Sequence, residues 1–322
     1  MQEILKEKDI YLDDYGEKWF ADETSFEKDL EEVWGGRWGL CSEVGKLKAV
    51  ALRRPGKEIE SVVNPADWRW GDVMDPDLAR LQHDALTKIY KDMGAKIIYV
   101  EDTRSDRPNA VFSRDNVLGT PEGVIICRQA LRLRRGEEAS MAMSVARAGC
   151  PIVRTISGTG VFEGACAMWV NRETIILGTG VRANEEGVRQ VEEVLRPMGV
   201  RNFIRFQIPY GHAHIDGLMN FVDRDKVLVF PWQTPYDVVK TLSDMGIKII
   251  EAPSIQEAKY QSAMNLVGLE PGRVLMASGN PITKKELERH GIEVVEIDVS
   301  ELRKGLGSVH CMTGALARDE DW

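Results

Sequence analysis

Apolar and polar residues follow one another along this chain in a pattern that recurs five times. In each recurrence a segment with helical spacing of apolar residues ends at a glycine, and a short β-rich apolar run follows. The glycines are Gly94, Gly149, Gly199, Gly246 and Gly291, which are 55, 50, 47 and 45 residues apart. Glycine at this place is typical of the left-handed residue that closes a helix. The pattern therefore predicts five helix–turn–strand units of similar length.

Two of the predicted helices carry a clear apolar stripe. The stripes consist of Leu78, Leu81, Ala85, Ile89 and Met93 in the first unit and of Val188, Val191, Leu195 and Met198 in the third. Residues at this spacing lie on one face of a helix, so each stripe is expected to face the core.

Pairs of apolar runs separated by polar turn residues precede most of the helices. The pairs are 117–119 with 124–126, 167–170 with 174–177, 219–222 with 227–230, and 264–267 with 274–276. Polar turns between such runs are typical of β-hairpins. Each unit is therefore predicted as a ββαβ repeat, and five repeats indicate a radial or stacked α/β architecture. The alternative is an ordinary two-domain α/β protein whose helices happen to end at glycine.

Residues 1–40 lie outside the repeat and are rich in charged residues and tryptophan. They are predicted to form a helical arm packed on a single domain of residues 41–322. No apolar run approaches the roughly 18 residues of a membrane span, and the first eight residues lack the apolar core of a signal peptide. These features favour a cytoplasmic protein that does not bind membranes, and its compact acidic surface is compatible with a homo-oligomer.

Charge and cysteine content exclude further classes of protein. The net charge of −9 argues against binding to a nucleic-acid backbone. The five cysteines are an odd number at irregular spacing, without a Cys-x-x-Cys pair, so neither a disulfide framework nor a zinc ribbon fits. A small-molecule substrate is the expected partner.

The polar residues that carry chemistry gather at equivalent points of the repeat. They lie in segments 108–115, 160–164 and 212–217, which enter the second, third and fourth units, and in the loop around Cys311, assigned to the fifth. A further segment, 178–184, forms a strand-to-helix turn of the third unit. Because equivalent strand ends surround one axis in a ring of repeats, these segments are expected to converge.

The set comprises a thiol, an imidazole, three carboxylates and an arginine, which suits attack on a planar cationic carbon. Cys311 follows two glycines in a stretch without helical or strand period, where a thiol is placed for chemistry more than for packing. A bound cation favours the thiolate, carboxylates hold that cation by charge-assisted hydrogen bonds, and a histidine transfers protons. Neither a metal nor an organic cofactor is required. Taken singly, Asp115, Glu163 and Arg182 also suit ordinary turns or surface ion pairs.

A metal site is the competing chemistry. His212, His214 and Asp216 alternate, so on one strand all three would face one cavity, and His310 with Cys311 adds ligand types. Against this, a second closely spaced ligand cluster is missing, and adjacent residues rarely both reach one ion.

At this point the chain resembles a known family. Segments 109–115, 162–164, 182–187, 214–216 and 308–313 are similar to the signatures of the guanidino-group-modifying enzymes, which include arginine deiminases, dimethylarginine dimethylaminohydrolases and amidinotransferases. The resemblance covers roughly residues 45–318 and implies the fold of that family, a five-bladed α/β propeller (pentein) with pseudo-fivefold symmetry.

The resemblance also implies three catalytic residues. Cys311 would be the nucleophile that forms a covalent thiouronium-type intermediate. His214 would be the general acid and base, and Glu163 would hold a substrate nitrogen and orient His214.

Four further residues are implied to bind substrate. Asp115 and Asp216 would clamp the guanidinium-like group. Arg182 and Asn109 match positions that contact the amino-acid end of the substrate in arginine-using members.

One departure bears on the substrate. Arginine deiminases carry Glu-Gly-Gly-Asp where this chain has Glu163-Gly164-Ala165-Cys166. The loss of that carboxylate points to another guanidine, or to a heterocycle with an amidine-like carbon such as a nitroimidazole. A flat apolar wall for it would come from Trp169, Trp232 or the pair Trp68 and Trp70.

The sequence therefore predicts a cysteine-dependent hydrolase that cleaves a C–N bond at a guanidine or amidine-like carbon. One alternative is an amidinotransferase, which passes the amidino group to an amine. The other is a non-enzymatic binding protein of the propeller class, such as a ribosome anti-association factor. That class has no use for the cysteine, histidine and carboxylates.

Overall fold

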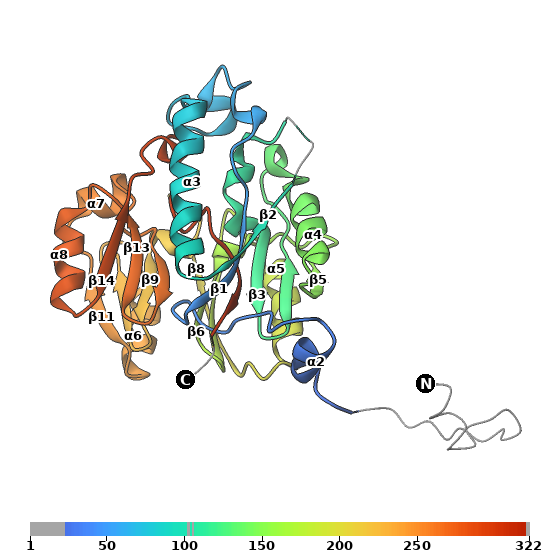
Figure 1. Cartoon of the computed structure of the whole chain (residues 1–322). Helices are drawn as coiled ribbons and strands as arrows, with labels where there is room; N and C mark the ends of the chain where they lie inside the picture. Colours follow the sequence, from blue (N-terminus) through green and yellow to red (C-terminus); the bar gives the residue numbers. More distant parts are fainter. Residues whose placement is uncertain (1–22, 102–103, 105, 320–322) are drawn as a thin grey trace, which may run out of the picture.

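The protein is arranged as five small three-stranded sheets, each accompanied by a helix (Figure 1). The structure, a computed structural model, describes residues 23–101, 104 and 106–319. In Figure 1 the early elements β2, β3 and α4 lie on one side of the molecule, and the late elements β13, β14 and α8 lie on the other. The five ββαβ units predicted from the sequence are thereby confirmed.

Each blade has the same strand order. From first to last strand the blades are β15 (Gly314–Arg318), β1 (Leu47–Leu52) and β2 (Lys96–Tyr99); β3 (Val117–Thr120), β4 (Gly123–Ile126) and β5 (Ile152–Thr155); β6 (Ala167–Asn171), β7 (Thr174–Thr179) and β8 (Asn202–Gln207); β9 (Met219–Asp223), β10 (Lys226–Val229) and β11 (Lys248–Glu251); and β12 (Val267–Glu270), β13 (Arg273–Ala277) and β14 (Glu293–Ile297). The middle strand pairs antiparallel with the first strand and parallel with the last. The first strands are almost wholly buried, whereas most residues of the last strands are exposed or half-buried. The first strand is therefore the inner strand of each blade.

A helix joins the middle strand to the outer strand in every blade. These helices are α3 (Pro76–Asp92), α4 (Glu137–Arg147), α5 (Glu185–Leu195), α6 (Tyr236–Asp244) and α8 (Pro281–Arg289). Two shorter helices, α2 (Phe26–Glu32) and α7 (Ile255–Tyr260), lie outside this scheme. The five glycines that follow the blade helices all have φ between 77° and 94°. This confirms that each glycine supplies the left-handed residue that ends its helix.

Short 3-10 helices fill many of the connections. They are η1 (Lys57–Ile59), η2 (Pro65–Trp68), η3 (Pro108–Val111), η4 (Ser113–Asn116), η5 (Arg132–Arg134), η6 (Gly164–Cys166), η7 (Ile215–Gly217) and η8 (Leu302–Gly305). Three of them, η4, η6 and η7, come directly before the inner strands β3, β6 and β9.

One of the two predicted apolar stripes faces the core and the other does not. Val188, Val191 and Leu195 of α5 are fully buried, as predicted. In α3 the prediction was wrong, because Leu78 and Leu81 are 41% and 66% exposed. Helix α3 buries a face one position further along instead, which includes Ala79, Gln82, His83, Leu86 and Tyr90.

The ring closes through the C-terminal strand. Strand β15 pairs antiparallel with β1, so the last strand of the chain completes the first blade. The loop around Cys311 therefore enters the first blade, and its assignment to the fifth unit was wrong. The inner strand of the fifth blade begins at Val267 rather than at Met264, which leaves residues 262–266 as the entry to that blade.

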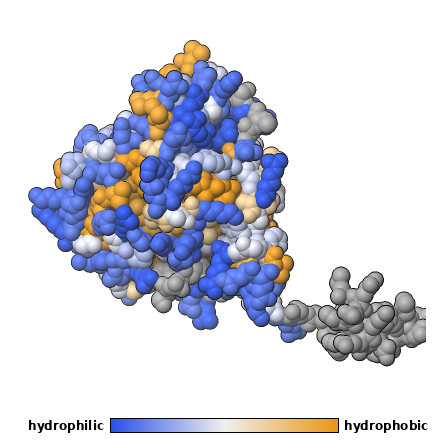
Figure 2. Space-filling model, viewed as in Figure 1, coloured by the Kyte–Doolittle hydropathy of each residue, from blue (hydrophilic) through white to orange (hydrophobic). Residues whose placement is uncertain are grey.

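Part of the N-terminal arm falls within the described residues. Leu30 of α2 and Trp38 are buried in an apolar cluster that also contains Val117 and Met141. Residues 1–22 lie outside the described residues, and the domain boundary at residue 40 stays a prediction. None of the helices in the described part of the chain is long and apolar enough to span a membrane. Figure 2 shows hydrophilic residues over α3 and α8, with hydrophobic residues between them.

The segments that lead into the inner strands, here called blade entries, approach one another closely at the centre. Gly164 of η6 is the clearest case, because a Cβ atom there would lie 2.3 Å from the carbonyl oxygen of Val117 and 2.4 Å from that of Arg114. Both oxygens belong to the backbone of the preceding blade, so neither can move aside cheaply. Gly164 thereby sets the distance between the entries that carry Asp115 and Glu163.

We expect Gly164→Ala to lower the free energy of unfolding by about 1–3 kcal/mol or more, because the added methyl group overpacks two backbone carbonyls. Denaturant unfolding measures the change. Gly180→Ala is the control, since its Cβ would meet only side-chain and backbone atoms of Ile208, the nearest at 3.3 Å. Equal stability losses in the two variants would contradict the close approach.

Candidate active site

A two-lobed cavity opens at the blade entries, and Cys311 lies where the lobes meet. The lobes have volumes of about 540 and 530 Å³ and share His214, Tyr260 and Cys311 among their lining residues. Asp115 and Arg182 line the first lobe, and Asp216 and Asn265 line the second. The convergence predicted from the repeat is therefore present.

Backbone strain is concentrated at the same cavity. Among the described residues, only Arg69, Ser262 and Leu306 combine a side chain with a positive φ, at 59°, 62° and 61°. All three line the first lobe. Such conformations cost free energy and gather at functional sites, so the strain marks this cavity independently of its titratable groups.

Cys311 sits in the turn that leads into β15. Its carbonyl oxygen accepts a hydrogen bond of 3.0 Å from the backbone N–H of Arg114, which fixes the turn against the entry of the second blade. Cys311 is partly exposed, whereas Cys41, Cys127, Cys150 and Cys166 are buried. Burial of the sulfur and the charges of Asp216 and Asp115 raise the pKa of the Cys311 thiol well above its ordinary value.

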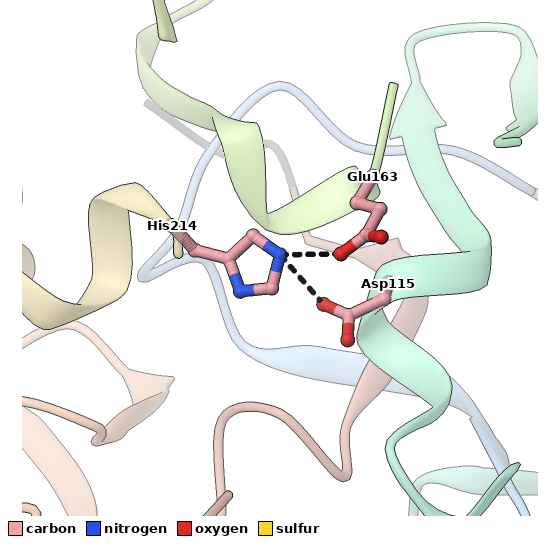
Figure 3. A group of neighbouring side chains, drawn as sticks. All are labelled: Asp115, Glu163 and His214. Atoms are coloured by element: carbon pink, nitrogen blue, oxygen red, sulfur yellow. Dashed lines mark hydrogen bonds and ion pairs between the residues drawn. The ribbon is translucent and has the colours of Figure 1, made fainter. Parts of the chain in front are cut away.

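His214 faces two carboxylates from other blades (Figure 3). Its Nε2 atom lies 2.7 Å from Glu163 Oε2 and 3.6 Å from Asp115 Oδ1. Burial opposes the positive charge on the ring, but Asp115 and Glu163 outweigh it and raise the pKa of His214. Glu163 is fully buried, yet its hydrogen bond to His214 helps to lower its pKa to about 2. The two carboxylates therefore favour the protonated form of the His214 ring.

Asp115 is held in place by an arginine that the sequence prediction missed. Arg134 Nη1 donates to Asp115 Oδ2 at 2.5 Å, while its Nε and Nη2 atoms donate to Glu137. Arg134 lies in the run Arg132-Leu133-Arg134-Arg135, which has no signal that separates a buried arginine from exposed ones. The other oxygen of Asp115, Oδ1, has no hydrogen-bond partner among the described residues.

Asp216 lies beside the thiol and is held there by His310 and Asn265. Its Oδ2 atom is 2.9 Å from His310 Nδ1, 2.8 Å from Asn265 Nδ2 and 3.6 Å from Cys311 Sγ. Burial would raise the pKa of Asp216, but the hydrogen bond and charge of His310 lower it to about 2. His310 in turn has a raised pKa, since Asp216 and Glu43 outweigh its burial.

Arg182 and Asn109 line the first lobe, and both are engaged with protein groups. Arg182 Nη1 lies 3.2 Å from Glu163 Oε1. Asn109 Oδ1 accepts from Trp70 Nε1 at 2.5 Å, and Asn109 Nδ2 donates to the carbonyl of Trp68 at 3.1 Å. In this state Asn109 therefore shapes the wall, and Arg182 helps to neutralise Glu163.

The tryptophans proposed as an apolar wall, and Cys166, differ in whether they line the cavity. Of the four tryptophans considered, Trp68 lines the cavity, while Trp169 and Trp70 are buried in the core. Trp232 is 53% exposed and packs against Phe230. Cys166 is fully buried and does not line either lobe, so its effect on substrate choice would be indirect.

The metal cluster considered from the sequence is not assembled. Residues 212–214 form a loop and 215–217 form η7, because a turn at Pro209 to His212 ends the extended chain. The three residues therefore do not alternate along one strand. His212 hydrogen-bonds Gln233 instead, and His310 is bound to Asp216.

A different group of potential ligands does exist. Among the described residues, one group with metal-ligand types and spacing stands out, and it comprises Asp115, Glu163 and His214. The two carboxylates raise the pKa of His214, and a metal could bind this ring only after it gives up its proton. The two carboxylates are already neutralised by Arg134 and Arg182.

Comparison with known proteins assigns the chain to one family. A family model described as N,N dimethylarginine dimethylhydrolase, eukaryotic, matches residues 72–318. The arginine deiminase of Borrelia recurrentis is 23% identical, and the alignment covers 87% of this chain and 98% of that protein.

Solved structures agree with this assignment. A dimethylarginine dimethylaminohydrolase from Pseudomonas aeruginosa, a cysteine-to-serine mutant complexed with citrulline, is 26% identical, with a TM-score of 0.68 over 83% of this chain and 98% of that one. The N-terminal domain of a cyanobacterial arginine dihydrolase, bound to its product, has a TM-score of 0.73 at 19% identity, covering 85% of this chain and 99% of that one. The latter supports the fold alone, and the five-bladed α/β propeller expected from the sequence is confirmed.

We expect Glu163→Gln to lower the pKa of His214, because the neutral amide removes the charge that stabilises the imidazolium. NMR titration of the labelled histidine rings measures the shift. Glu186→Gln, at a half-buried residue of α5 that is paired with Arg189, should leave it unchanged. A His214 pKa that is equal in wild type and Glu163→Gln would show that the pair does not control this proton.

Proposed function

This chain belongs to the N,N dimethylarginine dimethylhydrolase family, and from that premise we propose that it hydrolyses a C–N bond at a guanidine or amidine-like carbon. The observation that carries the proposal is the placement of the Cys311 thiol in one cavity with the His214–Glu163 ion pair. Asp115 and Asp216 add carboxylates to the same cavity. Of the residues that the resemblance implies as catalytic or clamping, Cys311, His214, Asp115 and Asp216 line the cavity, and Glu163 contacts His214.

The charges of the cavity favour a cationic substrate head. Asp115 Oδ1 is buried without a hydrogen-bond partner among the described residues, and an N–H group of a guanidinium would supply one. The same carboxylates oppose ionisation of Cys311. A bound cation offsets them, so binding of the substrate would itself promote formation of the thiolate.

The first half-reaction forms a covalent intermediate. Sγ of Cys311 gives up its proton, for which Asp216 Oδ2 at 3.6 Å is a nearby acceptor, and attacks the central carbon. The protonated His214 then donates its proton to the leaving nitrogen. The C–N bond breaks, the amine departs, and the carbon remains bound to sulfur as a thiouronium-like group.

The second half-reaction returns the enzyme to its starting state. Neutral His214 accepts a proton from water, and the hydroxide oxygen bonds to the same carbon. The C–S bond then breaks, the departing sulfur takes back the proton held by Asp216, and the hydroxyl proton of the ureido-type product passes to solvent or to the released amine. Glu163 holds the histidine ring in one orientation and stabilises its charge in both steps.

The walls of the first lobe would contact the part of the substrate beyond the reacting carbon. Trp68, Phe112 and Tyr260 supply flat apolar surface, which suits a planar or alkyl-chain body. We propose that Arg182 and Asn109 contact the far end of the substrate, as in the arginine-using relatives. Because Cys166 replaces an acidic residue, we propose a substrate other than free L-arginine, such as a modified guanidine or a nitroimidazole.

A parallel substrate screen tests this proposal. Free L-arginine, N-methylated arginines, simple guanidines and a nitroimidazole are each incubated with the enzyme, and ammonia or amine, nitrite and ureido products are quantified. We expect hydrolysis of at least one of the other compounds and slower turnover of free L-arginine. An added primary amine that diverts the carbon into a new guanidine would identify a transferase instead.

We expect Cys311→Ala to abolish turnover, a loss of at least about 10⁴-fold, because the covalent intermediate cannot form. Circular dichroism should show an unchanged fold. The control is Cys150→Ala, which removes a buried thiol remote from the cavity and should retain activity. More than trace activity in Cys311→Ala would overturn the nucleophile assignment.

We expect chelation to leave the activity unchanged, because the proposed reaction uses a proton between His214 and Glu163 where a metal would bind. Activity is measured before and after incubation with a chelator and again after addition of Zn²⁺. A chelator-induced loss that zinc restores would favour a metal held by Asp115, Glu163 and His214.

A further inference from the structure

Asn265 occupies the one blade entry that the sequence left without a function. Asp115, Glu163 and Asp216 lie at the entries to β3, β6 and β9, and Cys311 lies at the entry to β15. Asn265 holds the corresponding place before β12, in a turn closed by the hydrogen bond from its own N–H to the carbonyl of Ser262. The fivefold arrangement therefore brings it to the same centre as the proposed catalytic groups.

The side-chain amide of Asn265 is fully used, and each bond goes to the neighbourhood of the thiol. Nδ2 lies 3.1 Å from Cys311 Sγ and 2.8 Å from Asp216 Oδ2. Oδ1 accepts from the backbone N–H of His310 at 3.0 Å and from that of Cys311 at 3.3 Å. One side chain thus binds the sulfur, its backbone and the neighbouring carboxylate.

These partners fix which way the amide points. The two backbone N–H groups can only donate, so they require the oxygen, and the carboxylate of Asp216 can only accept, so it requires the NH₂ group. Sγ consequently receives an N–H bond rather than facing a carbonyl. Ala263, Met264 and Leu266 on either side are buried and hold Asn265 in this position.

The surroundings of the sulfur make this donor important. Asp216 Oδ2, at 3.6 Å from Sγ, repels a thiolate, and the charge of Asp115 acts in the same direction. The Nδ2 atom of Asn265 reaches both Sγ and Asp216 Oδ2, and its two N–H groups donate one hydrogen bond to each. His310, which binds the same Oδ2 atom from the other side, further neutralises the carboxylate.

We propose that Asn265 is a positioning residue that orients the Cys311 sulfur and stabilises it as a thiolate beside Asp216. This proposal rests on the proposed function, because it gives Cys311 the role of nucleophile. Asn265 acts through the sulfur and its backbone, so its loss should lower kcat much more than it changes KM.

Asn265→Asp tests the proposal with little change of shape. One oxygen of the new side chain can still accept from both backbone N–H groups, while the other replaces the NH₂ donor by an acceptor. The pH dependence of alkylation of Cys311 by iodoacetamide, followed by peptide mass mapping, reports the thiol directly. We expect its midpoint to rise by about one pH unit or more, kcat to fall about 10²-fold, and KM to stay within about threefold.

Two further variants separate this role from a structural one. Asn265→Ser, a milder change, should show the same direction of shift with a smaller loss. Asn280→Asp is the matched control, because Asn280 is a fully buried asparagine whose Nδ2 donates to the carbonyls of Gln261 and Ala277, away from the sulfur. It should lose stability in thermal unfolding without moving the alkylation midpoint of Cys311.

The outcomes distinguish the two proposals. Folded Asn265 variants that keep the wild-type alkylation midpoint and kcat would overturn the role of Asn265 while leaving the nucleophile intact. A Cys311→Ala enzyme that remains active would instead overturn the proposed function itself. A midpoint shift in Asn280→Asp equal to that in Asn265→Asp would assign the effect to general loss of stability and also overturn the role.

Discussion

Buried carboxylates surround the Cys311 thiol at the centre of this protein, and each of them needs a positive partner. An ionised carboxylate away from water is costly unless it is paired and hydrogen-bonded. Arg134 pairs with Asp115, and His310 pairs with Asp216. Glu163 has two partners, His214 and Arg182. Arg134 and Arg182 belong to the same blades as their carboxylates, whereas His214 and His310 reach theirs from another blade.

This constraint explains why the fold and the chemistry belong together. Each blade contributes one entry segment to the centre, and the close approach at Gly164 holds two of those entries together. The pairs leave Asp115 Oδ1 without a hydrogen-bond partner among the described residues, and they leave the sulfur between acidic groups. A bound cation would supply a partner for Asp115 Oδ1 and offset the acidic groups around the sulfur, which supports the guanidinium or amidinium head that we propose.

Much of this could be predicted from the sequence, because the repeat is local and strongly patterned. The glycine after each helix and the stripe of Val188, Val191 and Leu195 are set by neighbouring residues. The face of α3 was mispredicted because Gln82 is buried through bonds to Ser300 and the backbone of Glu301. Those partners lie more than 200 residues away, so no local pattern reveals them.

The candidate site was likewise predicted only in part from the sequence. Cys311, His214, Glu163, Asp115 and Asp216 belong to recognisable segments and were placed at the centre. Asn265 was missed because the strand was predicted to begin at residue 264, which hid the blade entry. Arg134 was missed because buried and exposed arginines look alike in a basic run. The assignment of roles to these residues stays a prediction.

The most direct test of the central claim is mass spectrometry of the enzyme quenched during turnover of its best substrate. The account predicts that the peptide containing Cys311 gains the mass of the substrate without its leaving amine, and that this adduct disappears as the ureido product forms. Product formation without any adduct on that peptide, or an adduct on another residue, would contradict it.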